Sequence, residues 1–144
     1  MPDSFDLQRF LTAQNAGGTY DQAVLELRRG RKRSHWMWFV FPQIAGLGTS
    51  PMSRRYAISG VEEATAYLQH HVLGPRLREV SNLVVDASTS DAVTIFGGID
   101  AQKLRSSMTL FRRADPTEPV FAAVLGQFFD GLPDRGTEEL LGSV

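Results

Sequence analysis

Residues 100–113 read Asp-Ala-Gln-Lys-Leu-Arg-Ser-Ser-Met-Thr-Leu-Phe-Arg-Arg, and their apolar side chains recur at the spacing of an α-helix. The apolar positions are Ala101, Leu104, Met108 and Phe111. Side chains three or four residues apart lie on one face of a helix, so this stretch predicts a helix with a buried stripe. Asp100 is expected to cap its first turn.

Similar spacing recurs on both sides of this stretch. It covers residues 7–11, 20–27, 61–68, 77–84 and 121–128. No segment alternates like a half-buried strand over more than a few residues. The apolar run 36–41 is expected to form a short buried helix ended by Pro42, and Ser59-x-x-Glu62 is expected to form a capping box.

The predicted fold class is therefore all-α. We expect residues 1–144 to form a single compact domain of about seven or eight short helices, with short tails at the two ends. Eight apolar side chains should be mostly buried in one cluster. They are Leu27, Phe39, Phe41, Leu77, Leu104, Phe111, Phe121 and Phe128.

Composition excludes several classes of protein. The chain has 144 residues, no cysteine and a formal net charge of -1. Without cysteine there are no disulfides, thiolate nucleophiles or zinc fingers, and near-zero charge argues against nucleic acid as a partner. The run 36–41 is too short to cross a bilayer, which takes roughly 20 residues, and the N-terminus does not resemble a signal peptide. We expect a soluble, cytoplasmic protein that binds no membrane.

Charge is nevertheless distributed unevenly along the chain. Residues 1–113 hold 14 basic and 10 acidic side chains, a net of +4, whereas residues 114–144 hold one basic and six acidic side chains, a net of -5. A dipolar surface that aids solubility explains this distribution. The alternative is that the acidic end shields or partners a basic site elsewhere.

Residues 28–56 depart from the helical pattern. Five cations lie within residues 28–33, both tryptophans follow at Trp36 and Trp38, and a loop then carries Gly46 and Gly48. Cations, glycines and hydroxyl donors are what an anion or phosphate site needs. The alternatives are that the cations complement a helix dipole and that the tryptophans fill the core.

A second basic segment covers residues 103–113. On a helix, Lys103 and Ser107 share one flank of the apolar stripe, and Arg105 lies on the other flank. Either flank could complete a pocket, and a lysine beside a serine is one arrangement that activates a nucleophile. The alternative is a solvated basic face.

Two hypotheses follow from these segments. In the first, they converge on one cleft for a small anionic, phosphate-bearing or nucleotide-like molecule. Its ligand-binding residues would be Arg31, Lys32, Trp36, Trp38, Gln43, Gly46, Gly48, Ser50, Arg54, Lys103, Arg105 and Ser106. His35, as an acid or base, and Ser107 are the catalytic candidates, although the sequence leaves open whether any reaction is catalysed.

In the second hypothesis, the protein is an interaction module without chemistry, in which the arginine-rich segment and exposed aromatic side chains meet an acidic protein partner. Neither hypothesis includes a cofactor. We expect no metal site, because His70 and His71 point apart on a helix or a strand and no carboxylate stands at ligand spacing.

Residues 30–43, followed by 46–48 and Ser50, resemble the signature of domain of unknown function family 1810. Residues 67–70 with 72–77, and 95–97 with 100 and 103–111, are similar to its second and third blocks. The resemblance extends from about Leu7 to Leu141, and His71 stands where many members are expected to carry proline. It implies a compact, mainly helical fold and no activity. Some members bear a calpastatin label, but this chain does not resemble a disordered, repeated protease inhibitor.

Overall fold

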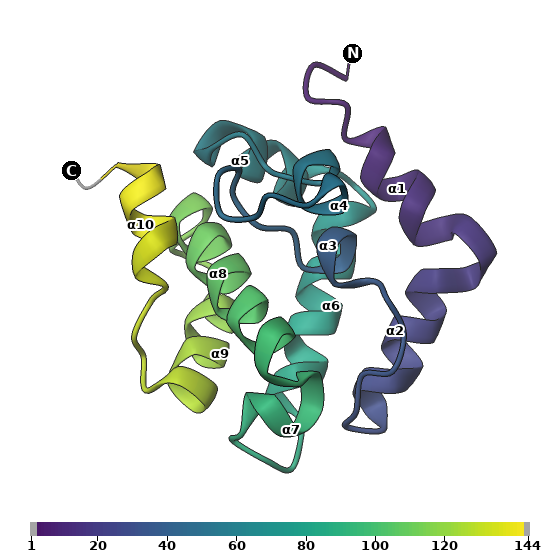
Figure 1. Cartoon of the computed structure of the whole chain (residues 1–144), viewed down its shortest axis with the longest axis vertical. Helices are drawn as coiled ribbons and strands as arrows, with labels where there is room; N and C mark the ends of the chain where they lie inside the picture. Colours follow the sequence, from purple (N-terminus) through teal and green to yellow (C-terminus); the bar gives the residue numbers. More distant parts are fainter. Residues whose placement is uncertain (1–2, 143–144) are drawn as a thin grey trace.

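The computed structural model describes residues 3–142, which form ten α-helices and one 3₁₀-helix (Figure 1). The helices are α1 (Gln8–Asn15), η1 (Ala16–Gly18), α2 (Thr19–Arg28), α3 (Met37–Val40), α4 (Pro51–Arg55), α5 (Val61–Gln69), α6 (Leu73–Val85), α7 (Ala92–Phe96), α8 (Gly98–Ala114), α9 (Pro119–Phe129) and α10 (Arg135–Leu141). The all-α prediction is confirmed. Helix α4 was not among the expected helices, because it is about one turn long and carries no apolar stripe.

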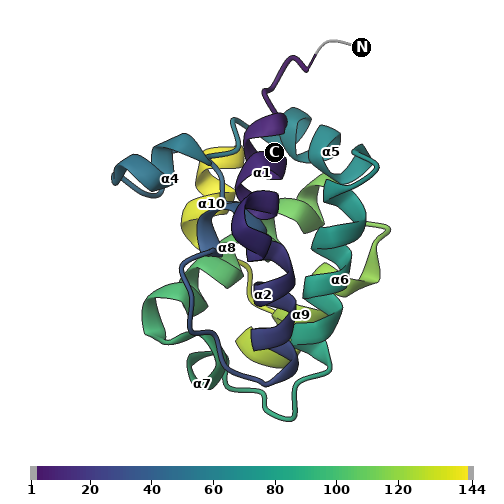
Figure 2. The ribbon, with the colours of Figure 1, turned by 90° about the vertical axis from the view of Figure 1, so that its right-hand side faces the viewer.

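Helix α8 lies at the centre of the arrangement. It packs against α5, α7, α9 and α10, while α6 packs against α2, α5 and α9. Figure 2 shows α1 and α2 running along one side of the molecule in front of α8, with α4 projecting to one edge. No helix within residues 3–142 is both long enough and apolar enough to cross a membrane.

The core forms where the apolar stripes of these helices meet. Of the eight side chains expected there, seven are buried in one cluster and Phe128 packs half-buried against it. The expected short helix at residues 36–41 is confirmed as α3. Trp36, directly before it, is fully buried, and its ring lies 6.2 Å from that of Phe41.

The capping box expected between Ser59 and Glu62 at the start of α5 is wrong, because Ser59 pairs with Glu63 instead. The backbone N–H and the hydroxyl of Ser59 both donate to Oε1 of Glu63, at 2.9 Å, and not to Glu62. The helix begins at Val61, which turns Glu63 towards Ser59. The other oxygen of Glu63 pairs with Arg9 at 3.0 Å and so ties α1 to α5.

Gly74 lies at a close approach between the consecutive helices α5 and α6. A Cβ at this position would lie 2.1 Å from the backbone oxygen of Leu68. A contact below about 3.0 Å forces the backbone to move, so the turn from α5 into α6 requires glycine here.

Substitution of this glycine should therefore destabilise the protein. We expect Gly74→Ala to lower the free energy of unfolding by at least about 1–3 kcal/mol, the usual cost of overpacking a tightly packed site. Urea denaturation followed by circular dichroism measures it. Gly126→Ala is the matched control, because a Cβ there meets no atom within 4 Å on an exposed part of α9. It should stabilise by about 0.5–1 kcal/mol, and equal losses for both variants would contradict the close-approach argument.

Candidate functional site

A buried carboxylate on α2 organises the segment that precedes the site. Glu26 is only 2% exposed and accepts five hydrogen bonds. The donors are the backbone N–H groups of Arg33 (2.8 Å) and Ser34 (2.9 Å), the hydroxyl of Ser34 (2.6 Å), Nε1 of Trp36 (2.9 Å) and Nε2 of Gln22 (2.9 Å). Sequence reasoning missed Glu26, because a lone acid in an amphipathic helix is ordinarily solvated.

These hydrogen bonds keep Glu26 ionised. Burial alone raises the pKa of a carboxyl group, but the donors around this carboxylate outweigh burial and lower its pKa to about 2. The hydroxyl of Ser34 and the backbone N–H of Arg33 contribute most to the lowering. Glu26 therefore serves as a fixed anion that holds residues 33–36 in place.

The same segment is held at two further points. The N–H of Arg31 donates to the backbone oxygen of Glu26 at 3.1 Å, and that of Lys32 donates to the oxygen of Ile95 at 2.8 Å. As a result Lys32 turns inward, while the Arg31 and Arg33 side chains remain exposed. His35 is exposed as well.

The two basic segments meet at Asp100. Its Oδ2 pairs with Nζ of Lys32 at 2.9 Å, and its Oδ1 pairs with Nζ of Lys103 at 3.5 Å. Each ammonium also lies over an indole ring, Lys32 5.1 Å from the centre of Trp36 and Lys103 4.8 Å from that of Trp38. Asp100 was expected to cap α8, but the helix begins at Gly98, so this carboxylate is inside the first turn.

Beside Lys103 lies a cleft of about 330 Å³. It is lined by Gln43, Leu47, Gly48, Ser53, Ile99, Gln102, Lys103, Ser106, Asp134 and Gly136. Its walls are the loop between α3 and α4, α4 itself, the N-terminal half of α8, and the segment that leads into α10. Four residues expected at the site, Gln43, Gly48, Lys103 and Ser106, therefore lie around one hollow.

Backbone hydrogen bonds and a close contact fix the loop wall of this cleft. The N–H of Ala45 donates to the oxygen of Ile58, and the N–H of Ile58 donates to the oxygen of Gln43, both at 2.8 Å. A Cβ at Gly48 would lie 2.5 Å from the hydroxyl oxygen of Ser53. The loop thus approaches α4 as closely as only glycine allows.

Several residues expected at the site lie elsewhere. Arg31, Arg54 and His35 are exposed and do not line the cleft. The hydroxyl of Ser50 accepts the N–H of Ser53 and caps α4, and Gly46 abuts the side chain of Leu140. Nε of Arg105 donates to the backbone oxygen of Leu132 at 2.9 Å.

Two expected roles are corrected by burial. Trp36 is fully buried and donates its indole N–H to Glu26, so its ring cannot stack on a ligand. Ser107 is also fully buried, and its Oγ has no hydrogen-bond partner within residues 3–142. It does not line the cleft beside Lys103, because its side chain lies on the part of α8 that neighbouring helices cover.

Six lining residues were not among the expected ligand contacts: Leu47, Ser53, Ile99, Gln102, Asp134 and Gly136. Gln102 and Ser106 stand four residues apart on α8, a spacing that could have indicated a shared face. Asp134 belongs to the acidic C-terminal segment and caps α10 by accepting the N–H of Thr137 at 2.9 Å. Only the tertiary fold brings it to the cleft.

Comparison with known proteins identifies the family of the chain and a solved structure that it resembles. The chain matches the family described as protein of unknown function (DUF1810) over residues 4–141. It belongs to that family. The DUF1810 chain is similar to the conserved hypothetical protein Rv1873 from Mycobacterium tuberculosis, whose crystal structure was determined at 1.38 Å. The two share 52% sequence identity over 99% of this chain and 100% of that chain, with a TM-score of 0.94. No curated protein matches the sequence.

Removal of the buried anion should destabilise this part of the protein. We expect Glu26→Gln to lower the free energy of unfolding by about 3 kcal/mol, because an amide leaves buried donors unpaired at roughly 1–3 kcal/mol each. Denaturant unfolding monitored by tryptophan fluorescence measures the loss. Glu62→Gln, at an exposed position in α5, is the control and should change stability by less than about 0.5 kcal/mol.

The same carboxylate should make stability depend on pH. The pKa of Glu26 is lower in the folded protein, about 2, than its ordinary value of 4.5. Its stabilisation is therefore complete above pH 4.5 and is lost as the pH falls towards 2. The difference in unfolding free energy between the wild type and Glu26→Gln should narrow over this range, and a constant difference would show that ionisation of Glu26 is not its source.

Proposed function

We propose that the cleft beside Lys103 binds a small anionic molecule, phosphate-bearing or nucleotide-like, through one anionic group. The supporting observation is that the two segments share one cleft. Gln43 and Gly48, from residues 28–56, line it together with Lys103 and Ser106, from residues 103–113. The cleft residues are proposed as ligand contacts and not as a catalytic set.

The polar lining suits an anion with further hydrogen-bonding groups. Lys103 supplies an ammonium group on one wall, and the amides of Gln43 and Gln102 supply neutral N–H donors. The hydroxyls of Ser53 and Ser106 can donate or accept. An anionic oxygen beside Lys103 would gain charge-assisted hydrogen bonds, which are about twice as strong as neutral ones.

Charge limits the ligand to one anionic group. The ammonium of Lys103 already shares Asp100 with Lys32, and Asp134 adds a carboxylate to the cleft wall. The formal charges of these two lysines and two aspartates sum to zero. No positive charge therefore remains to neutralise the further phosphate groups of a polyphosphate, which Asp134 repels. A monophosphate or a monocarboxylate carries fewer negative charges and meets less repulsion from Asp134.

An apolar edge borders the polar lining. Ile99 is 78% exposed, and the half-buried side chain of Leu47 also lines the cleft. These side chains offer contact for an apolar or planar part of the ligand. A nucleoside monophosphate combines such a group with one phosphate, and it is the probe that this lining favours.

A thermal-shift series tests the proposal, because a ligand that binds only the native state raises its stability. The probes are inorganic phosphate, adenosine, adenosine monophosphate and adenosine triphosphate. We expect the monophosphate to raise the melting temperature more than the other three. A ligand present at 100 times its dissociation constant raises the free energy of unfolding by about 2.7 kcal/mol.

Substitutions distinguish the cleft from other basic surfaces. Lys103→Gln should weaken monophosphate binding by about tenfold or more, whereas Lys103→Arg, which keeps the charge, should retain most of it. Arg31→Gln is the matched control outside the cleft and should bind like the wild type. Absence of a shift with every probe, or an unchanged shift in Lys103→Gln, would refute the proposed site.

A further inference from the structure

Four exposed arginines surround the end of α2 and the loop that follows it. They are Arg28, Arg29, Arg31 and Arg33. None forms an ion pair with an acid within residues 3–142. We call residues 28–33 the basic loop. The fifth cation of this loop, Lys32, is turned inward to Asp100, so the arginines alone face solvent.

The basic loop is held in a fixed conformation. Buried Glu26 accepts the N–H groups of Arg33 and Ser34, and Ile95 accepts that of Lys32. Gly30 allows the sharp turn after α2, since its φ is 77°. A surface that is already ordered loses less conformational entropy on binding than a flexible one. The arginines are therefore presented on a preorganised backbone.

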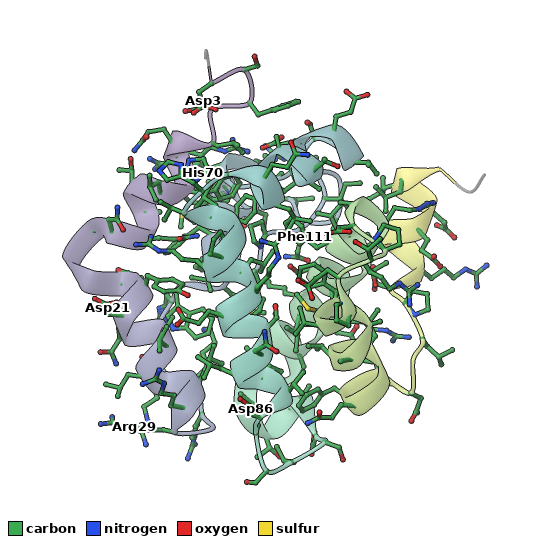
Figure 3. All side chains as sticks on the ribbon, turned by 180° about the vertical axis from the view of Figure 1, so that it is seen from behind. Asp3, Asp21, Arg29, His70, Asp86 and Phe111 are labelled. Carbon is green, nitrogen blue, oxygen red and sulfur yellow. The ribbon has the colours of Figure 1, made fainter. Side chains whose placement is uncertain are left out.

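A hollow of about 270 Å³ opens beside Arg28 and Arg29. It is lined by Leu27, Arg28, Arg29, Gly30, Leu83, Asp86, Ala87 and Ser88. Leu27 is buried, and Leu83 and Ala87 are half-buried, so the hollow has an apolar floor. Figure 3 shows Arg29 and Asp86 at the same end of the molecule, where α2 and α6 finish.

The charges around the hollow favour an acidic occupant. Arg28 and Arg29 line the hollow together with one carboxylate, that of Asp86, and the exposed Arg31 and Arg33 follow in the same loop. Guanidinium groups bind carboxylates with two parallel hydrogen bonds. The apolar floor adds a contact that a phosphate backbone would not use but an aliphatic side chain would.

From this combination we propose that the basic loop and the adjoining hollow dock an acidic peptide segment of a protein partner. Carboxylates of the segment pair with the arginines, and one apolar side chain between them enters the hollow over Leu27 and Leu83. This surface does not include the cleft beside Lys103, so the proposal stands independently of the proposed function.

Fluorescence anisotropy with labelled peptides tests this docking surface. The probes are Glu-Glu-Glu-Leu-Glu-Glu-Glu, the same peptide with Ser in place of Leu, and a thymidine oligonucleotide of matched charge. We expect the leucine peptide to bind about tenfold more tightly than the serine peptide, and more tightly than the oligonucleotide. Equal binding of the two peptides, or preference for the oligonucleotide, would overturn the proposal.

Variants localise the binding. Arg28→Gln combined with Arg29→Gln should weaken the leucine peptide by about tenfold, because the two exposed guanidinium groups that line the hollow are lost. The double variant Arg54→Gln and Arg55→Gln, at exposed positions of α4, is the matched control and should bind within twofold of the wild type.

Ser88→Trp examines the hollow alone, since Ser88 is exposed and its replacement buries no polar group. We expect the bulky indole to occupy the hollow and to abolish the preference for leucine over serine while the arginines still attract both peptides. Unchanged preference in this variant, or equal weakening in the α4 control, would contradict the assigned surface. Far-ultraviolet circular dichroism confirms that each variant is folded.

Discussion

The carboxylate of Glu26 is the constraint on which the N-terminal half of the structure depends. It satisfies donors from three successive parts of the loop after α2, including the indole of Trp36. A charged group in the core is costly unless it is fully hydrogen-bonded, and here every donor comes from neighbouring residues in sequence. The loop and the anion therefore stabilise each other, and residues 29–35 need no helix or strand to hold their conformation.

From this anchor the other polar contacts follow in order. The fixed loop directs Lys32 towards α8, where Asp100 receives it, and Asp100 in turn holds Lys103 at the edge of the cleft. The tryptophans contribute by packing: Trp36 fills the core beneath Lys32, and half-buried Trp38 lies below Lys103. Within the basic loop, Lys32 therefore points into the protein, whereas the four arginines face solvent.

The helices could be predicted from the sequence because their apolar spacing is a local property. The stripe of Leu104, Met108 and Phe111 faces the core, and Phe121 packs against Phe111 with ring centres 6.0 Å apart. Helix ends were less predictable: α5 begins one residue after the expected position and α8 begins three residues before it, which changed the partners of Ser59 and Asp100.

The candidate site was predictable only as far as residue type. Arg31 and Lys32 are adjacent and chemically similar, yet one is solvated and the other is inside, because backbone hydrogen bonds to Glu26 and Ile95 set their directions. Ser107 shares a helix flank with Lys103 in the sequence pattern, but neighbouring helices cover α8 at Ser107 and bury that hydroxyl. Asp134 reaches the cleft from the other end of the chain, which no local pattern encodes.

Asp100 gives this arrangement a thermodynamic consequence, since its two oxygens are divided between Lys32 and Lys103. An anion that draws Lys103 away leaves Asp100 wholly to Lys32 and strengthens the attachment of the loop to α8. A change that loosens Lys32 conversely binds Lys103 more firmly to Asp100 and makes it less available in the cleft. Linkage makes any such coupling reciprocal, and Asp100 is the carboxylate through which it would act.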